Sequence, residues 1–259
     1  MKKIILLLAI AITVLSCKKE DDTPNETNAT VVFNFTHNWD DTPVNSSDFG
    51  EIQYTNAHGE QLSIDKLRYL ISNIALTNED GETTIFEGYN LVDLTSNSNL
   101  TYYPQIEIPA GTYTVSFTFG FDNENNIDGV YNDLNAASWN VPQMMGGGYH
   151  FMQMEGSFIN DNSVSTFYQY HTIKAVDNTG PELVFQDTFF TVNLGEAIIN
   201  NSSSIEVKMN IAEWYKNPNV WDLNVLNSSL MPNFDAQVMM SENGATVFSL
   251  GEITNLVLE

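Results

Sequence analysis

The chain of 259 residues carries 33 acidic side chains against only 9 lysines and arginines, which gives a formal net charge of −24. Binding to nucleic acid depends on clustered cations that contact phosphates, so this composition excludes a nucleic-acid-binding protein. A surface so negative favours cationic partners or metal ions instead. The single cysteine excludes a disulfide within the chain, and an aromatic content of 12% supplies ample material for a core.

The first residues have the pattern of a secretory signal peptide. Lys2 and Lys3 precede an uncharged apolar run over residues 4–15. This run is shorter than the about 20 residues that cross a bilayer, and it ends in small residues. Its end, Val14-Leu15-Ser16-Cys17, resembles a lipobox, which predicts a signal peptide over residues 1–16 and a lipid on Cys17 that attaches the protein to a membrane. An ordinary signal peptide with an incidental cysteine is the alternative.

Residues 17–30 are expected to form a flexible acidic tether, because they are polar and rich in Thr, Asn and acidic residues. The run Lys18-Lys19-Glu20-Asp21-Asp22 resembles the signal that directs lipoproteins of Bacteroidetes to the outer face of the outer membrane. We therefore expect an outer membrane lipoprotein on the cell surface, with a periplasm-facing anchor as the alternative.

Residues 31–259 are expected to form a single domain, because no change of composition marks a linker. Alternation of apolar and polar residues, with turn sequences such as Asn-Glu-Asp-Gly between the segments, predicts many strands and few helices. The fold class is therefore all-β, a two-sheet antiparallel β-sandwich with short helical turns near residues 63–67, 130–137 and 211–215. The main expected strands are 31–37, 67–76, 111–121, 149–158, 167–173, 183–194 and 205–211.

Four segments, in order, resemble the MbnP-like family of periplasmic or surface proteins found beside methanobactin and copper-handling genes. The most specific is the run Arg-Tyr-Leu-Ile-Ser-Asn-Ile within residues 64–74. The others are Phe-Asn-Phe-Thr-His at 33–37, Ile-Pro-Ala-Gly-Thr-Tyr at 108–113, and Trp139 followed by Gly-Tyr-His-Phe-Met at 148–152, Glu-Gly at 155–156 and His171.

The resemblance implies copper binding without catalysis. In the family the metal lies between histidine nitrogens and a tryptophan that a partner enzyme, a di-haem protein of the cytochrome c peroxidase type, has oxidised to kynurenine. The sequence departs from the family at one place. Members carry a histidine after a Leu-Asn pair ahead of the tryptophan, whereas Ala136 follows Leu134-Asn135 here, so another ligand would have to compensate.

The resemblance points to His37, His171 and Trp139 as metal-site residues, because each falls at a matching position. His150 is a further candidate, since period two would place it on one strand face with Met152 and Met154, and imidazole and thioether both suit copper. For each of these residues, packing in the core is the alternative. His58, in Asn-Ala-His-Gly, is expected to be a turn residue only.

Two other functions remain open. An oxygen-rich loop, Asp122 to Gly129, would suit a structural calcium ion, although its spacing is not that of an EF-hand. Exposed Trp214 and Trp221 would make the domain a surface module that binds glycans or a partner protein. Catalysis is not expected, since Gly-x-Ser-x-Gly and His-Glu-x-x-His are absent from the sequence.

Overall fold

The computed structural model describes residues 28–256. The expected signal peptide, Cys17 with its expected lipid, and most of the expected tether lie outside the described residues. The tether was expected to reach residue 30, and this is wrong for its last three residues, which already belong to the first strand, β1 (Asn28–Trp39). Among the described residues, no helix is both long and apolar enough to cross a bilayer.

The first sheet is built around β1. This strand pairs in parallel with β15 (Ser203–Asn210), which pairs antiparallel with β16 (Phe248–Asn255). The other edge of β1 pairs with three short strands, β2 (Thr42–Pro43), β7 (Thr101–Tyr102) and β8 (Glu107–Pro109). The parallel β1–β15 pair departs from the otherwise antiparallel arrangement, and the long stretch of chain between the two strands provides the crossover that a parallel pair needs.

The second sheet is built around β5 (Lys66–Asn78). One edge of β5 pairs with β6 (Thr83–Asp93), while the other pairs with β10 (Met152–Ile159) along its first half and with β9 (Gly111–Phe119) along its second. Beyond these strands lie β11 (Ser165–Thr172) on β10 and β14 (Phe190–Ile199) on β9. The short β3 (Tyr54–Thr55) and β4 (Gln61–Leu62) complete it. The all-β sandwich expected from the sequence is confirmed.

The main core lies between the two sheets, and aromatic rings fill it. Tyr69 of β5 makes an edge contact with Phe35 of β1 at 6.4 Å between ring centroids, and Phe117 of β9 does so with Phe248 of β16 at 5.2 Å. Side chains alternate between the faces of a strand, so Arg68, the neighbour of Tyr69, points to the outer face of the second sheet. This outer face carries the site described below.

The short helical elements agree only in part with the sequence. Helix α1 (Asn132–Ala136) and the 3-10 helix η3 (Ile211–Tyr215) lie at expected places. The turn expected at residues 63–67 is wrong, because the backbone of Ser63 and Asp65 pairs with β10 instead. The short 3-10 helices η1 (Ser46–Asp48), η2 (Gln143–Met145) and η4 (Gly244–Thr246) complete the helical turns.

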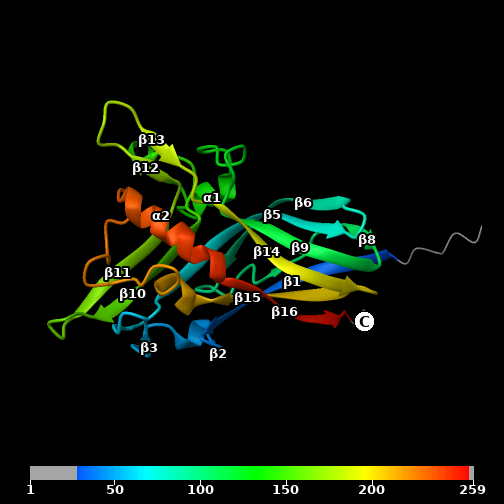
Figure 1. The fold of residues 1–259 in the computed structure, drawn as a ribbon, viewed down its shortest axis with the longest axis horizontal. Coiled ribbons are helices and arrows are strands. Elements are labelled where there is room, and N and C mark those ends of the chain that lie inside the picture. The colour runs from blue at the N-terminus through cyan, green and yellow to red at the C-terminus, as the bar shows by residue number, and fades with distance from the viewer. Residues whose placement is uncertain (1–27, 257–259) are drawn as a thin grey trace, which may run out of the picture.

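Two elements near the C-terminal half differ from the expected pattern. The longest helix of the described residues, α2 (Phe234–Asn243), was not expected. The single strand expected over residues 183–194 is interrupted. Its first part, β13 (Val184–Gln186), forms a separate hairpin with β12 (Ala175–Asp177), and only its second part joins β14. In Figure 1, α2 and this hairpin lie toward the end of the molecule opposite the Asn28 end of β1.

Candidate metal centre

A second, smaller apolar cluster covers the outer face of the second sheet. It consists of Leu70, Phe121, Leu134, Trp139 and Tyr149, all buried. The segment that follows β9 forms this cluster by folding back over the sheet. The Tyr149 hydroxyl ties the segment together, because it accepts a hydrogen bond from the Tyr131 backbone N–H and donates one to the Asn135 side chain, both at 2.9 Å. The cluster thus holds Trp139 in a fixed place.

Three of the sequence-predicted residues converge at this face. The ring centroids of Trp139 and His150 are 5.7 Å apart, and those of His150 and His171 are 5.3 Å apart. Trp139 follows α1, His150 precedes β10, and His171 lies on β11, so three separate elements supply the group. All three side chains are buried. The β-sheet register also places Arg68 and Gln153 on this face, since Gln153 lies between Arg68 and His171 across the strands.

His150 is held with one ring nitrogen toward the cluster. Its Nδ1 lies 2.9 Å from the backbone oxygen of Trp139, where it donates a hydrogen bond, which leaves Nε2 as the nitrogen with a free lone pair. Nε2 lies 3.2 Å from the Met231 sulfur. Burial lowers the pKa of His150 to about 4, and the nearby His171 and Arg68 contribute in the same direction. The imidazole is therefore neutral at neutral pH.

His171 is oriented by a carboxylate. Its Nε2 lies 2.8 Å from Glu155 Oε1, and Lys66 Nζ lies 2.9 Å from the same oxygen. The hydrogen bond from His171 is the largest cause that lowers the pKa of Glu155 to about 2, with Lys66 adding to it. When Nε2–H donates to the carboxylate, Nδ1 carries the lone pair. A histidine that donates its second N–H to a carboxylate or a backbone carbonyl is the usual arrangement of a metal ligand.

Trp139 packs against the Arg68 cation as well as against His150. The Arg68 guanidinium carbon is 4.9 Å from the indole centroid, and the same guanidinium donates to Gln153 Oε1. Within the described part of the chain, the buried indole Nε1 has no hydrogen-bond partner. A buried N–H without an acceptor costs free energy, and the described residues around the indole offer none to this N–H.

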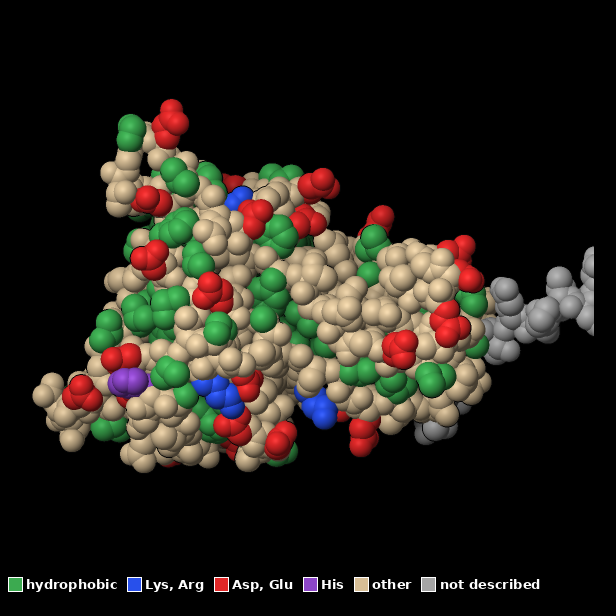
Figure 2. Space-filling view, viewed as in Figure 1, with side chains coloured by type: hydrophobic (Ala, Val, Ile, Leu, Met, Phe, Trp, Pro, Cys, Tyr) green, Lys and Arg blue, Asp and Glu red, His purple; other side chains and the backbone are tan. Residues whose placement is uncertain are grey.

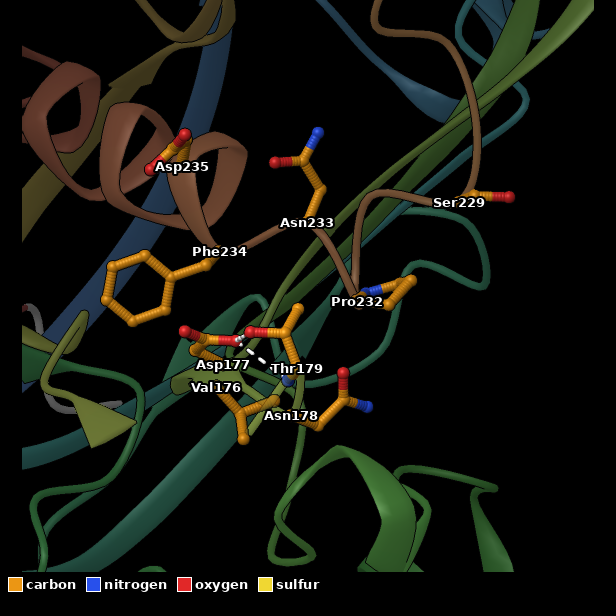
Figure 3. A pocket seen from close by; sticks show the side chains of 9 residues that line it. All are labelled: Val176, Asp177, Asn178, Thr179, Ser229, Pro232, Asn233, Phe234 and Asp235. Carbon is orange, nitrogen blue, oxygen red and sulfur yellow. Dashed lines mark hydrogen bonds between the residues drawn. The ribbon is translucent and has the colours of Figure 1, made fainter. Parts of the chain in front are cut away.

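A cavity of 260 Å³ opens onto His171. It is lined by Met145, Gln169, His171, Ser229, Leu230, Met231 and Pro232. A larger hollow of 490 Å³ adjoins it between β12 and the start of α2 (Figure 3). The Asp177 carboxylate in that hollow accepts hydrogen bonds from the backbone and hydroxyl of Thr179, and its lining contains no histidine or sulfur. The donors that suit a soft metal therefore lie at the smaller cavity.

His37 lies away from the other histidines. It contacts Tyr69, with its Nε2 3.1 Å from the tyrosine hydroxyl, and is thus inside the sandwich on the opposite face of the second sheet from Arg68. Burial lowers the pKa of His37 to about 4. The structure does not bring His37 together with His150, His171 and Trp139.

The expected trio of His150, Met152 and Met154 is wrong. β10 begins only at Met152, so the alternation does not extend back to His150. Met152 and Met154 belong to the main core, where the Tyr215 hydroxyl donates to the Met154 sulfur at 3.6 Å. The thioether beside His150 is that of Met231, which sequence reasoning missed because it lies in an irregular segment with no periodic signal.

Trp214 and Trp221 were expected to be exposed stacking surfaces, which is wrong, because both are 0% exposed. In the Asp122 loop, the carboxylate accepts hydrogen bonds from Glu124 and Asn125 within the loop and from Asn73 on β5. Calcium binding there stays a prediction.

The fold, the buried His150, His171 and Trp139, and the half-buried Met231 together define an all-β sandwich with a candidate metal centre outside its main core. The MbnP family model matches residues 28–233, and the chain belongs to this family, as its sequence motifs indicate. The solved structure of MbnP from Methylosinus trichosporium is similar in fold, with a TM-score of 0.57 and 13% identity, over 87% of this chain and 99% of that one. No curated protein sequence matches the chain.

Proposed function

We propose that this protein binds copper at the cluster of His150, His171 and Met231 beside Trp139, and that it is a binding protein and not an enzyme. One observation carries the proposal. Two buried imidazoles from different elements each have one ring nitrogen held by a hydrogen bond, and a thioether lies 3.2 Å from the free nitrogen of His150. Imidazole with thioether is a donor set that suits Cu(I).

The protonation states of the cluster suit metal ligation. A metal ligand must be unprotonated, and the pKa of His150, about 4, means that no proton competes at neutral pH. Glu155, whose pKa is about 2, is ionised and accepts the hydrogen bond of His171, while Lys66 balances its charge. Copper would be held by the two imidazoles and the sulfur, and it would supply a redox-active, soft Lewis-acid centre there.

Met231 also offers a replacement for the histidine that family members carry after the Leu-Asn pair and that this sequence lacks. The position after Leu134-Asn135 is Ala136, which is exposed at the end of α1. Met231 comes from the segment before α2 and approaches His150 from another direction. In our proposal this sulfur takes the place of the missing imidazole as a third donor, which favours the Cu(I) state over Cu(II).

Copper binding is tested by titration of Cu(I) in competition with a chromophoric chelator. We expect one copper per chain, and we expect His150→Gln and His171→Gln each to weaken binding by at least the roughly 10–100-fold that loss of an orienting partner costs at metal sites. His58→Gln is the matched control, because it removes an imidazole outside the cluster. Equal affinity in all three variants would refute the assignment, provided that circular dichroism shows each one folded.

We also propose that Trp139 is oxidised to kynurenine by a di-haem partner of the cytochrome c peroxidase type. The support is its position next to His150 and its indole N–H, which has no partner among the described residues. Peptide mass analysis of protein from its native host should find the mass change of this conversion in the Trp139 peptide. Trp214 and Trp221 are equally buried but lie elsewhere, so they serve as internal controls. An unmodified Trp139 in copper-loaded native protein would contradict the proposal.

A further inference from the structure

A second group of metal-ligating side chains lies away from the His150 cluster. His58 and Glu60 come from the turn between β3 and β4, and Asp222 comes from the loop after Trp221. His58 Nδ1 is 2.8 Å from Glu60 Oε1, and His58 Nε2 is 3.7 Å from Asp222 Oδ2. One ligand atom from each residue lies within 4.8 Å of the others, and no other such trio of His, Cys, Asp or Glu occurs among residues 28–256.

The backbone around the trio is fixed by hydrogen bonds. The Asn56 side-chain oxygen accepts from the backbone N–H groups of Gly59 and Glu60, at 2.9 and 3.0 Å, which closes the turn. The Asn56 side-chain nitrogen donates to the Trp221 backbone oxygen, so the turn is tied to the loop that carries Asp222. These hydrogen bonds hold the turn and the loop together without the ion pairs that His58 makes with Glu60 and Asp222.

The Glu60 carboxylate points to a ligand. Its side chain is 4% exposed, and Oε1 faces the cluster, where it contacts His58 and accepts from Asn224 at 3.0 Å. The second oxygen, Oε2, is buried and has no hydrogen-bond partner within the described residues. A buried carboxylate oxygen without a partner is unfavourable, and a cation that Glu60 binds through both oxygens would satisfy it.

From this geometry we infer that His58, Glu60 and Asp222 bind a divalent transition cation of the Zn²⁺ class. Imidazole nitrogen and carboxylate oxygen are both ligands of zinc, and zinc with three protein ligands completes its shell with water. Calcium is disfavoured because it takes six to eight oxygen ligands. Sulfur is absent from the trio, so the site differs from the His150 cluster in the metal that it prefers.

The surroundings add negative charge and an accessible entry. Glu60, Asp222 and Asp161 all raise the pKa of His58, and the hydrogen bond to Glu60 is the largest cause. The His58 side chain is 44% exposed, so a cation can reach the imidazole from solvent. A bound proton on His58 is the competitor of the metal, and zinc binding is therefore expected to release protons.

The test is calorimetric titration of Zn²⁺ alone into the full mature chain that carries His150→Gln and His171→Gln. The two substitutions keep zinc binding at the His150 cluster from contributing to the measured heat. We expect one zinc per chain. His58→Ala and Asp222→Asn should each weaken binding at least tenfold, and Asp161→Asn, which removes a nearby charge outside the trio, should change it less than about threefold. Absence of zinc binding, or equal losses in His58→Ala and Asp161→Asn, would overturn the inference.

A second measurement uses the wild-type chain, in case the double variant is unstable. Only four histidines contribute imidazole resonances in NMR spectra, and His58→Ala assigns one of them. Zinc at the trio should shift the His58 resonances at one equivalent and should raise the melting temperature through mass action. Shifts confined to the other histidines would place the zinc elsewhere and refute the site.

Discussion

Burial lowers the pKa of both His37 and His150 to about 4, but the two imidazoles have different neighbours. His37 contacts a tyrosine hydroxyl inside the sandwich, whereas His150 faces a second histidine and a sulfur. The lowered pKa alone therefore does not identify a ligand. What distinguishes His150 is that the Met231 sulfur lies at its free nitrogen and a second imidazole packs against its ring.

His37 should make stability depend on pH. Its pKa falls from 6.5 to about 4 on folding, so the unfolded chain binds the proton more readily and protonation favours unfolding. The contribution of neutral His37 is complete above pH 6.5 and is lost as the pH falls toward 4. We expect the unfolding free energy of the wild type, relative to His37→Gln, to decrease by up to about 1.4 kcal/mol per pH unit in this window.

Urea denaturation at several pH values measures this difference. Tyr69→Phe is the control, because it removes the hydrogen-bond partner but leaves His37 buried, and burial is the cause of the shift. The pH dependence should persist in that variant. A difference between wild type and His37→Gln that stays constant from pH 7 to 4.5 would show that His37 does not titrate with a lowered pKa.

Most residues of the candidate site could be predicted from the sequence, but which of the candidates lie together in space could not. Motif positions singled out Trp139 and His171, and strand alternation added His150. The structure brings these three together. The motif positions also included His37, which lies on the opposite face. Which face a strand residue occupies depends on how the sheets pack, which local sequence does not encode. His58 was predicted to be a turn residue only, because its partner Asp222 lies far along the chain.

Among the elements, α2 connects the site to the rest of the fold through Gln237. This fully buried side chain accepts from the Ile173 backbone N–H at 2.8 Å and donates to the backbone oxygens of His171 and Leu230, at 2.9 and 3.0 Å. It therefore joins the end of β11 to the segment that carries Met231. The helix holds two of the candidate metal donors in their relative positions.

We expect Gln237→Leu to destabilise the protein and to weaken copper binding together. The substitution leaves several buried backbone groups unpaired, at a cost of about 1–3 kcal/mol each. Met231→Leu is the matched variant. It conserves volume, so it should cost less than about 1.5 kcal/mol of stability, but it removes the sulfur and should weaken Cu(I) binding. Thermal denaturation and chelator competition separate the two effects. Normal copper affinity in Met231→Leu would exclude the sulfur as a ligand.

The strands were largely predictable and α2 was not, for a physical reason. Strand alternation is strong where one face packs in the core, as for Val31, Phe33 and Phe35 of β1. In α2 the buried positions are Ala236, Gln237, Met240 and Asn243, which are spaced as in a helix. Two of the four are polar, and they are buried because they hydrogen-bond to distant backbone groups. The apolar pattern that would reveal this helix is therefore interrupted.

At the scale of the whole molecule, the two ends differ. The Asn28 end of β1, which follows the predicted tether, lies at one end of the long axis, and α2, β10, β11 and the β12–β13 hairpin lie toward the other (Figure 1). Acidic side chains are spread over the face shown in Figure 2, with few lysines or arginines between them. The candidate copper site therefore lies toward the end of the domain away from Asn28, on a surface that attracts cations.

Cys17→Ser tests the anchor. Without the thiol no lipid can be attached, so the protein should move from the membrane fraction to the soluble fraction, and the mature wild type should carry a lipid mass on its N-terminal peptide. Replacing Lys18-Lys19-Glu20-Asp21-Asp22 by Ser and Gly is the matched variant. It should keep the lipid but reduce digestion of the domain by protease added to intact cells, because this run is the predicted surface signal. Membrane association that survives Cys17→Ser would contradict the lipid anchor, whereas unchanged protease access in the second variant would contradict only the export signal.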